Sequence, residues 1–426
     1  MHNALRSLGT LLLLSSLSVG VAPGAGAADA PGATRLPPPA PIRPVTETFW
    51  GRKVTDNYRY MEALGPETIE WMKAQGAYTR SVLDRIKPLA NLQADVAKFS
   101  ASFGLVQGYV RFGGRAFYEE RAPGSDNFDL IVADETGTRK LVDVGALRAA
   151  NGGKPYAINY FLASPDGAKV AVGISAGGSE DAELSVYEAV GGKRIAGPVD
   201  RAQFGATSWS DDSKTLYFIR LKKLAATAPP SDKYKYATAD SWDLKSEPVV
   251  LLGAGVGHGP EFLPAEFPAI SVSVGAPLAT ALSINGVQNE LAMWTAPAAK
   301  LADPKVAWTK FITRDDGVTG ADMRGPDIFL LSHRDAPTFK VLSVSAGRPL
   351  ASATVVVAAR PDRVIEGIHA ASDALYVVAR HGAYSQLLRI PTGSTKIEEV
   401  ALPFEGHIEE AFTDPRFPGT TVKLSS

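Results

Sequence analysis

The sequence contains no cysteine among its 426 residues. The chain therefore cannot form disulfide bonds, carry a lipid on an N-terminal cysteine or bind metal through thiolates. Histidine is also scarce, and no two of the six histidines stand three or four positions apart, which excludes the histidine pair of a helical metal site. Neither sign of charge is in excess, because 44 basic residues face 45 acidic ones. No basic surface is therefore expected to hold a nucleic acid.

A long apolar run occurs only at the N-terminus. Arg6 precedes an apolar stretch at residues 8–21, and small residues follow at positions 25–28. This order is typical of a secretory signal peptide, and the run is shorter than the roughly 20 residues that span a membrane. We expect residues 1–27 to be removed, leaving a periplasmic or secreted protein with no integral membrane span. The alternative is an uncleaved N-terminal anchor.

One segment has strong helical periodicity. Pro66 suits the first turn of a helix and Pro88 ends it. Between them, residues at spacings of three, four and seven form one largely apolar stripe: Ile69, Met72, Thr79, Val82, Leu83 and Ile86. A weaker helix is expected to follow through Leu92 and Val96. With the proline-rich leader at residues 37–41, this pattern predicts a leader and a helical segment over residues 28–95.

From about residue 100 the pattern changes to short β-rich runs separated by turn residues. Residues 164–172 (SPDGAKVAV) align with residues 210–218 (SDDSKTLYF), 46 positions later, and the strands at 328–331 and 375–378 lie 47 positions apart. Repeats of about 40–50 residues, each a few strands closed by turns, are typical of propeller blades. We therefore expect an all-β propeller over residues 96–426, interrupted by a long loop at 222–245.

The N-terminal region carries a resemblance to a known family. Residues 44–51 (PVTETFWG), 54–62 (VTDNYRYME) and 70–75 (EWMKAQ) resemble, in this order, prolyl-oligopeptidase-type serine peptidases. Asn57 and Tyr60 stand where the family typically has proline and tryptophan, so the subfamily is not defined. The tetrapeptides at 164–167 and 177–180 and the pentapeptide at 402–406 are similar to the family's propeller motifs.

The resemblance implies a fold and a domain arrangement. It implies a seven-bladed propeller that caps an α/β-hydrolase domain and admits only short peptides. On this basis we expect the last blade to be incomplete and the catalytic domain to be absent from this chain.

A Gly-x-Ser-x-Gly pattern at residues 173–177 raises Ser175 as a candidate nucleophile. A nucleophile elbow needs that serine between a strand and a following helix, but a turn and another strand are expected here. We interpret the motif as a glycine-rich hairpin, with catalysis as the alternative. The histidines that could complete a triad are expected to be structural or on the surface: His258, His333, His369, His381 and His407.

The sequence supports a metal site as weakly as it supports a catalytic triad. His407 and Glu409 could share one strand face, but two ligands make a weak site. The pairs at 211–212 and 315–316 are acidic residues of the kind that accept backbone hydrogen bonds in turns. An inter-blade calcium site is the alternative for them. The sequence therefore predicts no catalytic, cofactor-binding or metal-binding residue in this chain, and no cofactor.

Two functions remain open. In the first, the chain is the substrate-gating part of an exported prolyl-oligopeptidase-like serine peptidase that hydrolyses short proline-containing peptides. Its partners would be those peptides and a missing or separate α/β-hydrolase domain, and the chain alone would be inactive. In the second, the chain is a non-catalytic periplasmic propeller that binds a peptide or protein.

Overall fold

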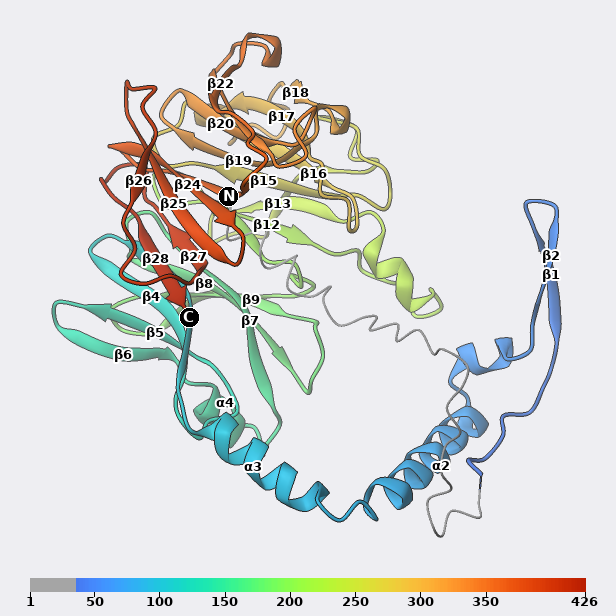
Figure 1. Cartoon of the computed structure of the whole chain (residues 1–426). Helices are drawn as coiled ribbons and strands as arrows, with labels where there is room; N and C mark the ends of the chain where they lie inside the picture. The colour runs from blue at the N-terminus through green and yellow to red at the C-terminus, as the bar shows by residue number, and fades with distance from the viewer. Residues whose placement is uncertain (1–35) are drawn as a thin grey trace. The chain divides into compact units, whose positions relative to one another are not determined.

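A computed structural model describes residues 36–426, and the expected signal peptide lies outside the described residues. The described chain divides at residues 103 and 104 into an N-terminal unit and a larger β-rich unit (Figure 1). Within residues 36–426, no helix combines the length and the apolar character needed to cross a membrane.

The N-terminal unit contains a hairpin and two α-helices. The hairpin pairs β1 (Val45–Phe49) with β2 (Arg52–Asp56), and a 3₁₀ helix, η2 (Arg59–Ala63), follows. The helices are α2 (Pro66–Leu83) and α3 (Leu89–Ala101). Both predicted helices are therefore present, although α2 ends at Leu83, five residues before Pro88.

The proline-rich leader and Arg43, which follows it, contact α2 through hydrogen bonds. The Trp71 indole N–H donates to the Pro38 carbonyl at 3.0 Å, and the Arg43 guanidinium donates two hydrogen bonds to the Glu67 carboxylate at 2.7 and 3.0 Å. Three apolar residues of the stripe, Ile69, Met72 and Ile86, nevertheless remain exposed. The helical stripe is therefore not covered within this unit.

The larger unit contains six four-stranded antiparallel sheets, each formed by consecutive strands, as a propeller requires. The first three sheets comprise β3 (Leu105–Phe112), β4 (Arg115–Arg121), β5 (Asp129–Asp134), β6 (Gly137–Val142), β7 (Tyr156–Ala163), β8 (Lys169–Ala176), β9 (Glu183–Glu188), β10 (Arg194–Val199), β11 (Ala206–Trp209), β12 (Leu216–Arg220), β13 (Thr238–Trp242) and β14 (Val249–Gly253). The next three comprise β15 (Phe267–Val272), β16 (Leu278–Ile284), β17 (Ala292–Pro297), β18 (Thr309–Ile312), β19 (Val318–Arg324), β20 (Asp327–Ser332), β21 (Lys340–Ser345), β22 (Thr354–Val357), β23 (Val364–Ala370), β24 (Ala374–His381), β25 (Tyr384–Pro391) and β26 (Glu398–Val400). Short helices lie in the connections: α4 (Val144–Ala150), η3 (Pro230–Tyr234), η4 (Ala298–Lys300), η5 (Arg314–Asp316) and η6 (Leu350–Ser352).

The expected number of seven blades is corrected to six. After the sixth four-stranded sheet, the described chain adds only the two-stranded sheet of β27 (His407–Phe412) and β28 (Thr421–Ser425). β27 packs against both β25 of the sixth blade and β3 of the first. The hairpin therefore lies between the last blade and the first, but it lacks the two outer strands of a blade.

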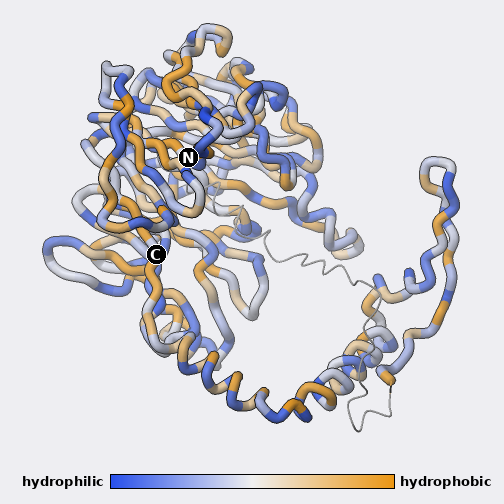
Figure 2. The backbone as a smooth tube through the Cα atoms, viewed as in Figure 1, coloured by the Kyte–Doolittle hydropathy of each residue, from blue (hydrophilic) through white to orange (hydrophobic). Residues whose placement is uncertain are grey.

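The core consists of apolar side chains packed between neighbouring blades. Three consecutive residues of β8, Val170, Ala171 and Val172, are fully buried, because both faces of a blade are covered. Figure 2 shows hydrophobic residues along the strands and hydrophilic residues in many of the connecting loops. Burying one large apolar side chain contributes roughly 1.5–3 kcal/mol, so these inter-blade layers are a principal source of stability.

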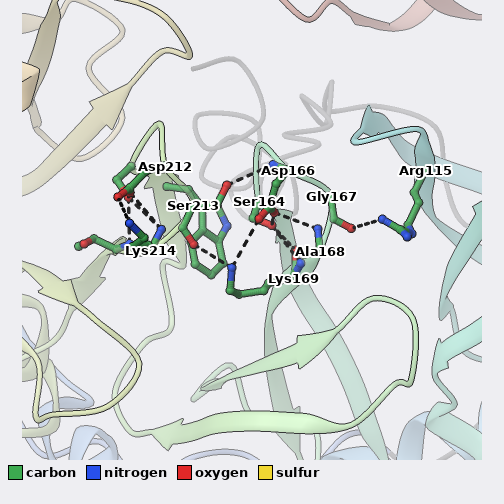
Figure 3. A network of polar contacts seen from close by, with 12 residues as sticks. Arg115, Ser164, Asp166, Gly167, Ala168, Lys169, Asp212, Ser213 and Lys214 are labelled. Carbon is green, nitrogen blue, oxygen red and sulfur yellow. Dashed lines mark hydrogen bonds and ion pairs between the residues drawn. The ribbon is translucent and has the colours of Figure 1, made fainter.

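The 46-residue repeat is confirmed by equivalent turns in the second and third blades (Figure 3). The Ser164 hydroxyl donates to Asp166 at 2.5 Å, and the Ser210 hydroxyl donates to Asp212 at 2.7 Å. The two turns also contact each other, because the Asp166 N–H donates to the Ser213 hydroxyl at 3.1 Å. The turn chemistry read from the sequence thus stabilises one blade and joins it to the next.

The loop expected over residues 222–245 needs correction, because β13 lies inside it. β13 pairs with β12 through the register Leu216↔Trp242 and with β14 on its other side. Trp242 is buried, and its indole N–H donates to the Ser246 carbonyl at 2.9 Å. β13 therefore forms because it pairs with two neighbouring strands and buries Trp242, although the sequence of residues 222–245 shows no alternation of apolar and polar residues.

Candidate functional site

Ser175 lies within a strand rather than at an elbow. It belongs to β8, pairs with Ala157 of β7 and is 4% exposed. A two-glycine turn and then β9 follow it, where a nucleophile elbow has a helix. This geometry does not present the serine hydroxyl to a substrate.

Packing and turn conformation explain the two glycines of the same motif. A Cβ atom at Gly173 would lie 2.2 Å from the Tyr160 ring, so only glycine leaves room for that ring. Tyr160 is itself buried and its hydroxyl donates to the Ala202 carbonyl at 2.8 Å. Gly177 has φ +70°, which a turn here requires and which side-chain-bearing residues rarely adopt. The motif is thus explained by inter-strand packing and a turn.

The five candidate histidines are dispersed over the larger unit. His258 lies in the loop before β15, and His381 ends β24. His333 Nε2 lies 2.9 Å from a Glu290 oxygen, and His407 Nδ1 lies 3.2 Å from the Ser385 hydroxyl.

The Ser385–His407 pair does not resemble an active site, because Ser385 is buried and its oxygen accepts the Ile408 N–H at 3.0 Å. The remaining histidine, His369, is buried in β23 beside a central cavity.

The acidic pairs act in turns and caps. Asp211 accepts the Gly275 N–H at 3.3 Å across two blades, and Asp316 accepts both the N–H and the hydroxyl of Thr313 at 2.8 Å. Glu409 forms an ion pair with Lys423 at 2.6 Å. Among the described residues, no three histidine, aspartate or glutamate side chains converge as metal ligands.

The candidate site is a cavity of about 160 Å³ at one end of the propeller axis, which we call the channel mouth. It is lined by the carboxyl ends of the innermost strands of all six blades and of β27. Small aliphatic, serine and threonine residues make up most of the lining, and four aromatic side chains, one acid and one histidine join them: Phe112, Phe161, Trp209, Phe412, Asp322 and His369. A mostly apolar cavity that also presents several polar groups is suited to binding.

Hydrogen bonds between neighbouring inner strands hold the channel mouth in shape. The Trp209 indole N–H donates to the Leu162 carbonyl at 3.1 Å, which joins the second and third blades. The Ser208 hydroxyl donates to the Ile270 carbonyl at 3.0 Å, which joins the third and fourth. Such contacts make the mouth a preformed opening.

Asp322 is the acid of the channel mouth. Burial raises the pKa of its carboxyl group, and hydrogen bonds from the Ala370 and Met323 N–H groups act in the opposite direction. The Ala370 N–H donates at 2.8 Å and the Met323 N–H at 2.8 Å. Asp322 thus joins the fifth and sixth blades and adds a polar group to the lining.

The lining of the channel mouth was not predicted from the sequence, although the repeat contained a signal. Ala163 and Trp209 both line it, and they stand 46 positions apart, each immediately before a serine that opens a repeat unit. The end of the strand that precedes each such turn therefore marks the axis of the propeller.

Comparisons with known proteins agree with this architecture. The sequence profile described as "Prolyl oligopeptidase, N-terminal beta-propeller domain" matches residues 37–236 and 281–426. No match was found among curated proteins. A solved structure from a study of two prolyl endopeptidases is similar, with a TM-score of 0.74, 21% identity and coverage of 88% of this chain and 54% of that one.

Prolyl oligopeptidase B from Galerina marginata, bound to a 25-residue macrocyclization substrate, is also similar. Its TM-score is 0.77 at 14% identity, over 91% of this chain and 57% of that one. A complex of the same enzyme with a 35-residue substrate has a TM-score of 0.73 at 15% identity, over 88% and 55% of the two chains. At these identities the likeness concerns the fold, and this chain spans about half the length of the solved structures that it matches.

Proposed function

Because this chain belongs to the prolyl oligopeptidase family, as its N-terminal β-propeller domain, we propose that it is the substrate-gating part of an exported serine peptidase. The intact peptidase would hydrolyse short proline-containing peptides in an α/β-hydrolase domain outside residues 1–426. The channel mouth would be the opening through which a peptide passes.

The observation that carries this proposal is the channel mouth itself. An opening of about 160 Å³, lined by every inner strand, accepts a slender extended chain more readily than a folded protein. The inter-blade hydrogen bonds keep the opening narrow without help from a ligand. Size selection is therefore a property of the propeller, separate from bond cleavage.

The first test concerns the chemistry. Residues 28–426 alone should not turn over chromogenic proline peptides, whereas the same chain joined to an α/β-hydrolase domain encoded in frame beyond Ser426 should. Saturable turnover by the chain alone, abolished by Ser175→Ala, would contradict the proposal. Turnover that Ser175→Ala leaves unchanged would indicate a contaminating enzyme.

The second test concerns the gate. In the joined enzyme, Val274→Trp should narrow the channel mouth, which Val274 lines. The value of kcat/KM should then fall more for long peptides than for short ones. Glu135→Trp, on an exposed turn of the first blade, is the matched control. An equal effect of both substitutions at every peptide length would remove the gating role.

Export is the remaining part of the proposal. It rests on the order of Arg6, the apolar stretch at 8–21 and the small residues at 25–28. N-terminal sequencing of protein from the periplasm should find a start close to residue 28. A product that begins at Met1 and stays with the membrane fraction would show an anchor instead.

A further inference from the structure

The connection between β27 and β28 is fastened to blades on both sides of the first blade. It comprises residues 413–420, which we call the strap, and two of them, Thr413 and Pro415, line the channel mouth. β27 packs against β3, so the strap begins beside the first blade. From there its contacts reach the β23–β24 turn of the sixth blade and the β7–β8 turn of the second. The strap therefore spans the first blade at the rim of the channel mouth.

Hydrogen bonds from main-chain groups fix the strap to the sixth blade. The Phe417 carbonyl accepts the Ser372 N–H at 3.0 Å, and the Gly419 N–H donates to the Asp373 carboxylate at 2.8 Å. Asp373 is itself held in place by the Arg389 guanidinium, which donates to it at 3.0 Å. This end of the strap is therefore anchored twice to one turn.

A single side chain joins the strap to the second blade. Nη2 of Arg416 donates to the Pro165 carbonyl at 2.8 Å, the one hydrogen bond that the described residues place between the strap and that blade. Asp414, whose side chain is 5% exposed, holds the same guanidinium through contacts of 2.6–3.3 Å. The hydrogen bond and charge of Asp414, followed by the charges of Asp211 and Asp166, raise the pKa of Arg416. The guanidinium is therefore charged and aimed at the second blade.

Space behind the strap leaves it room to move. A hollow of about 450 Å³ separates the strap from the β3–β4 turn of the first blade, at residues 111–114. Among the described residues, no hydrogen bond joins the strap to that turn. The turn itself lies directly on the second blade, because a Cβ atom at Gly113 would lie 1.9 Å from the Asp166 carbonyl oxygen. The first two blades therefore stay packed against each other whether or not the strap is fastened.

The two ends of the strap are held unequally. Two hydrogen bonds hold the end at the sixth blade, whereas one holds the end at the second blade, where the Arg416 side chain is 34% exposed. Segments with few buried contacts and exposed hydrogen bonds open at the lowest free energy. The end at the second blade is therefore the end that is released first.

We propose that the strap sets the width of the channel mouth, hinged on the sixth blade and fastened to the second blade by Arg416. When Arg416 leaves the Pro165 carbonyl, Pro415 and Pro165 separate, and both of these residues line the mouth. Arg416 is then a specificity-determining residue, because the fastened strap admits only slender chains. This consequence for peptides rests on the proposed gating function, whereas the opening of the strap does not.

Thiol labelling of the full chain tests the opening. The chain has no cysteine, so an introduced one is a single reporter. Pro165→Cys keeps the carbonyl that Arg416 contacts and places a thiol at a buried residue beside the strap. Its reaction with a maleimide should be about 5- to 30-fold faster when Arg416→Ala is added, as expected for loss of one partly exposed hydrogen bond to a charged group. An unchanged labelling rate overturns the proposal.

A second reporter and a matched control separate opening of the strap from general loss of stability. Ala171→Cys, in the fully buried part of β8, should label at the same rate with and without Arg416→Ala; faster labelling at both positions would show unfolding and refute the strap. Arg360→Ala is the control, since Arg360 donates to both oxygens of Asp362 at 2.9 Å, also two residues away, without joining two blades. It should leave both rates unchanged. Arg416→Lys keeps one donor but loses the planar pairing, so its rate should be intermediate.

The enzyme joined to its hydrolase domain tests the consequence for peptides. Arg416→Ala should raise kcat/KM for long peptides relative to short ones, by up to the factor seen in labelling, and Arg360→Ala should not. Faster labelling at position 165 with no change in this ratio would uphold the strap and refute the passage of peptides through the channel mouth. A changed ratio without faster labelling would refute the strap and leave the gating function standing.

Discussion

The join between β27 and the first blade can be tested at Glu410. Its carboxylate accepts the Gly108 N–H at 2.9 and 3.1 Å with its two oxygens, and the Tyr109 N–H at 3.3 Å. Both donors lie where the β3–β4 register shifts between Gln107 and Val110, so the regular ladder is interrupted there. Glu410 therefore supplies the hydrogen bonds that a bulge in β3 leaves open.

The expected cost of Glu410→Ala follows from this geometry. A hydrogen bond to a charged group contributes about 1.5–3 kcal/mol, and the site is only half-buried, so we expect a loss of about 2 kcal/mol. For a unit of the size of residues 104–426, about 1–3 °C accompanies each kcal/mol, so the melting temperature should fall by about 2–6 °C. Glu410→Gln, which keeps one acceptor oxygen, should have an intermediate effect.

Thermal unfolding followed by circular dichroism measures the loss, and amide hydrogen exchange locates it. Glu409→Ala is the matched control on the same strand, because its ion pair with Lys423 is partly exposed and such pairs contribute about 0–1 kcal/mol. The Gly108 and Tyr109 amides should exchange faster in Glu410→Ala only. Equal melting temperatures for the two variants, or unchanged exchange at both amides, would refute the assigned role of Glu410.

Three further predictions concern packing, the helical segment and charge. Gly173→Ala should lower the free energy of unfolding, measured by chemical denaturation, by about 1–3 kcal/mol, because its Cβ would collide with a buried tyrosine ring. Ser175→Ala should lower the free energy of unfolding by less. The reverse order of the two effects would contradict the packing explanation. Ile69→Glu combined with Leu83→Glu should reduce self-association in analytical ultracentrifugation, since Ile69 is exposed; a sharp fall in the melting temperature of the β-rich unit would show that the stripe is docked. Hydrogen bonds from two arginines lower the pKa of Asp200 to about 2, so its stabilisation is present above its ordinary pKa and is lost as the pH falls from about 4 toward 2. Asp200→Asn should therefore make the free energy of unfolding depend less on pH between about 4 and 2. An unchanged pH dependence would show that protonation of Asp200 does not affect stability.

Local chemistry explains why part of this protein could be predicted. Hydrogen bonds that span two to five residues form the turns that begin at Ser164 and Ser210, so they follow from composition at fixed offsets. The periodicity that predicted α2 is equally local, because residues three and four apart share a helix face. Family membership, confirmed over most of the chain, rests on similarly short tracts.

Other features depended on residues far apart in the chain. β13 forms because β12 and β14 pair with it and Trp242 is buried, although residues 222–245 show no alternation. Gly173 and Ser175 match a catalytic pattern, and only the position of Tyr160 shows that the glycine is there for packing. The number of complete blades likewise depended on which strands find partners.

The sequence by itself determined the repeat, its turns, the helical segment and the family. Tertiary structure alone decided that the described residues form six four-stranded blades, that β27 lies between the sixth blade and the first, and which residues line the channel mouth. The physical reason is the range of the interactions. Turns and helices satisfy their hydrogen bonds among neighbours in sequence, whereas a ring of sheets brings together side chains that are tens to hundreds of residues apart.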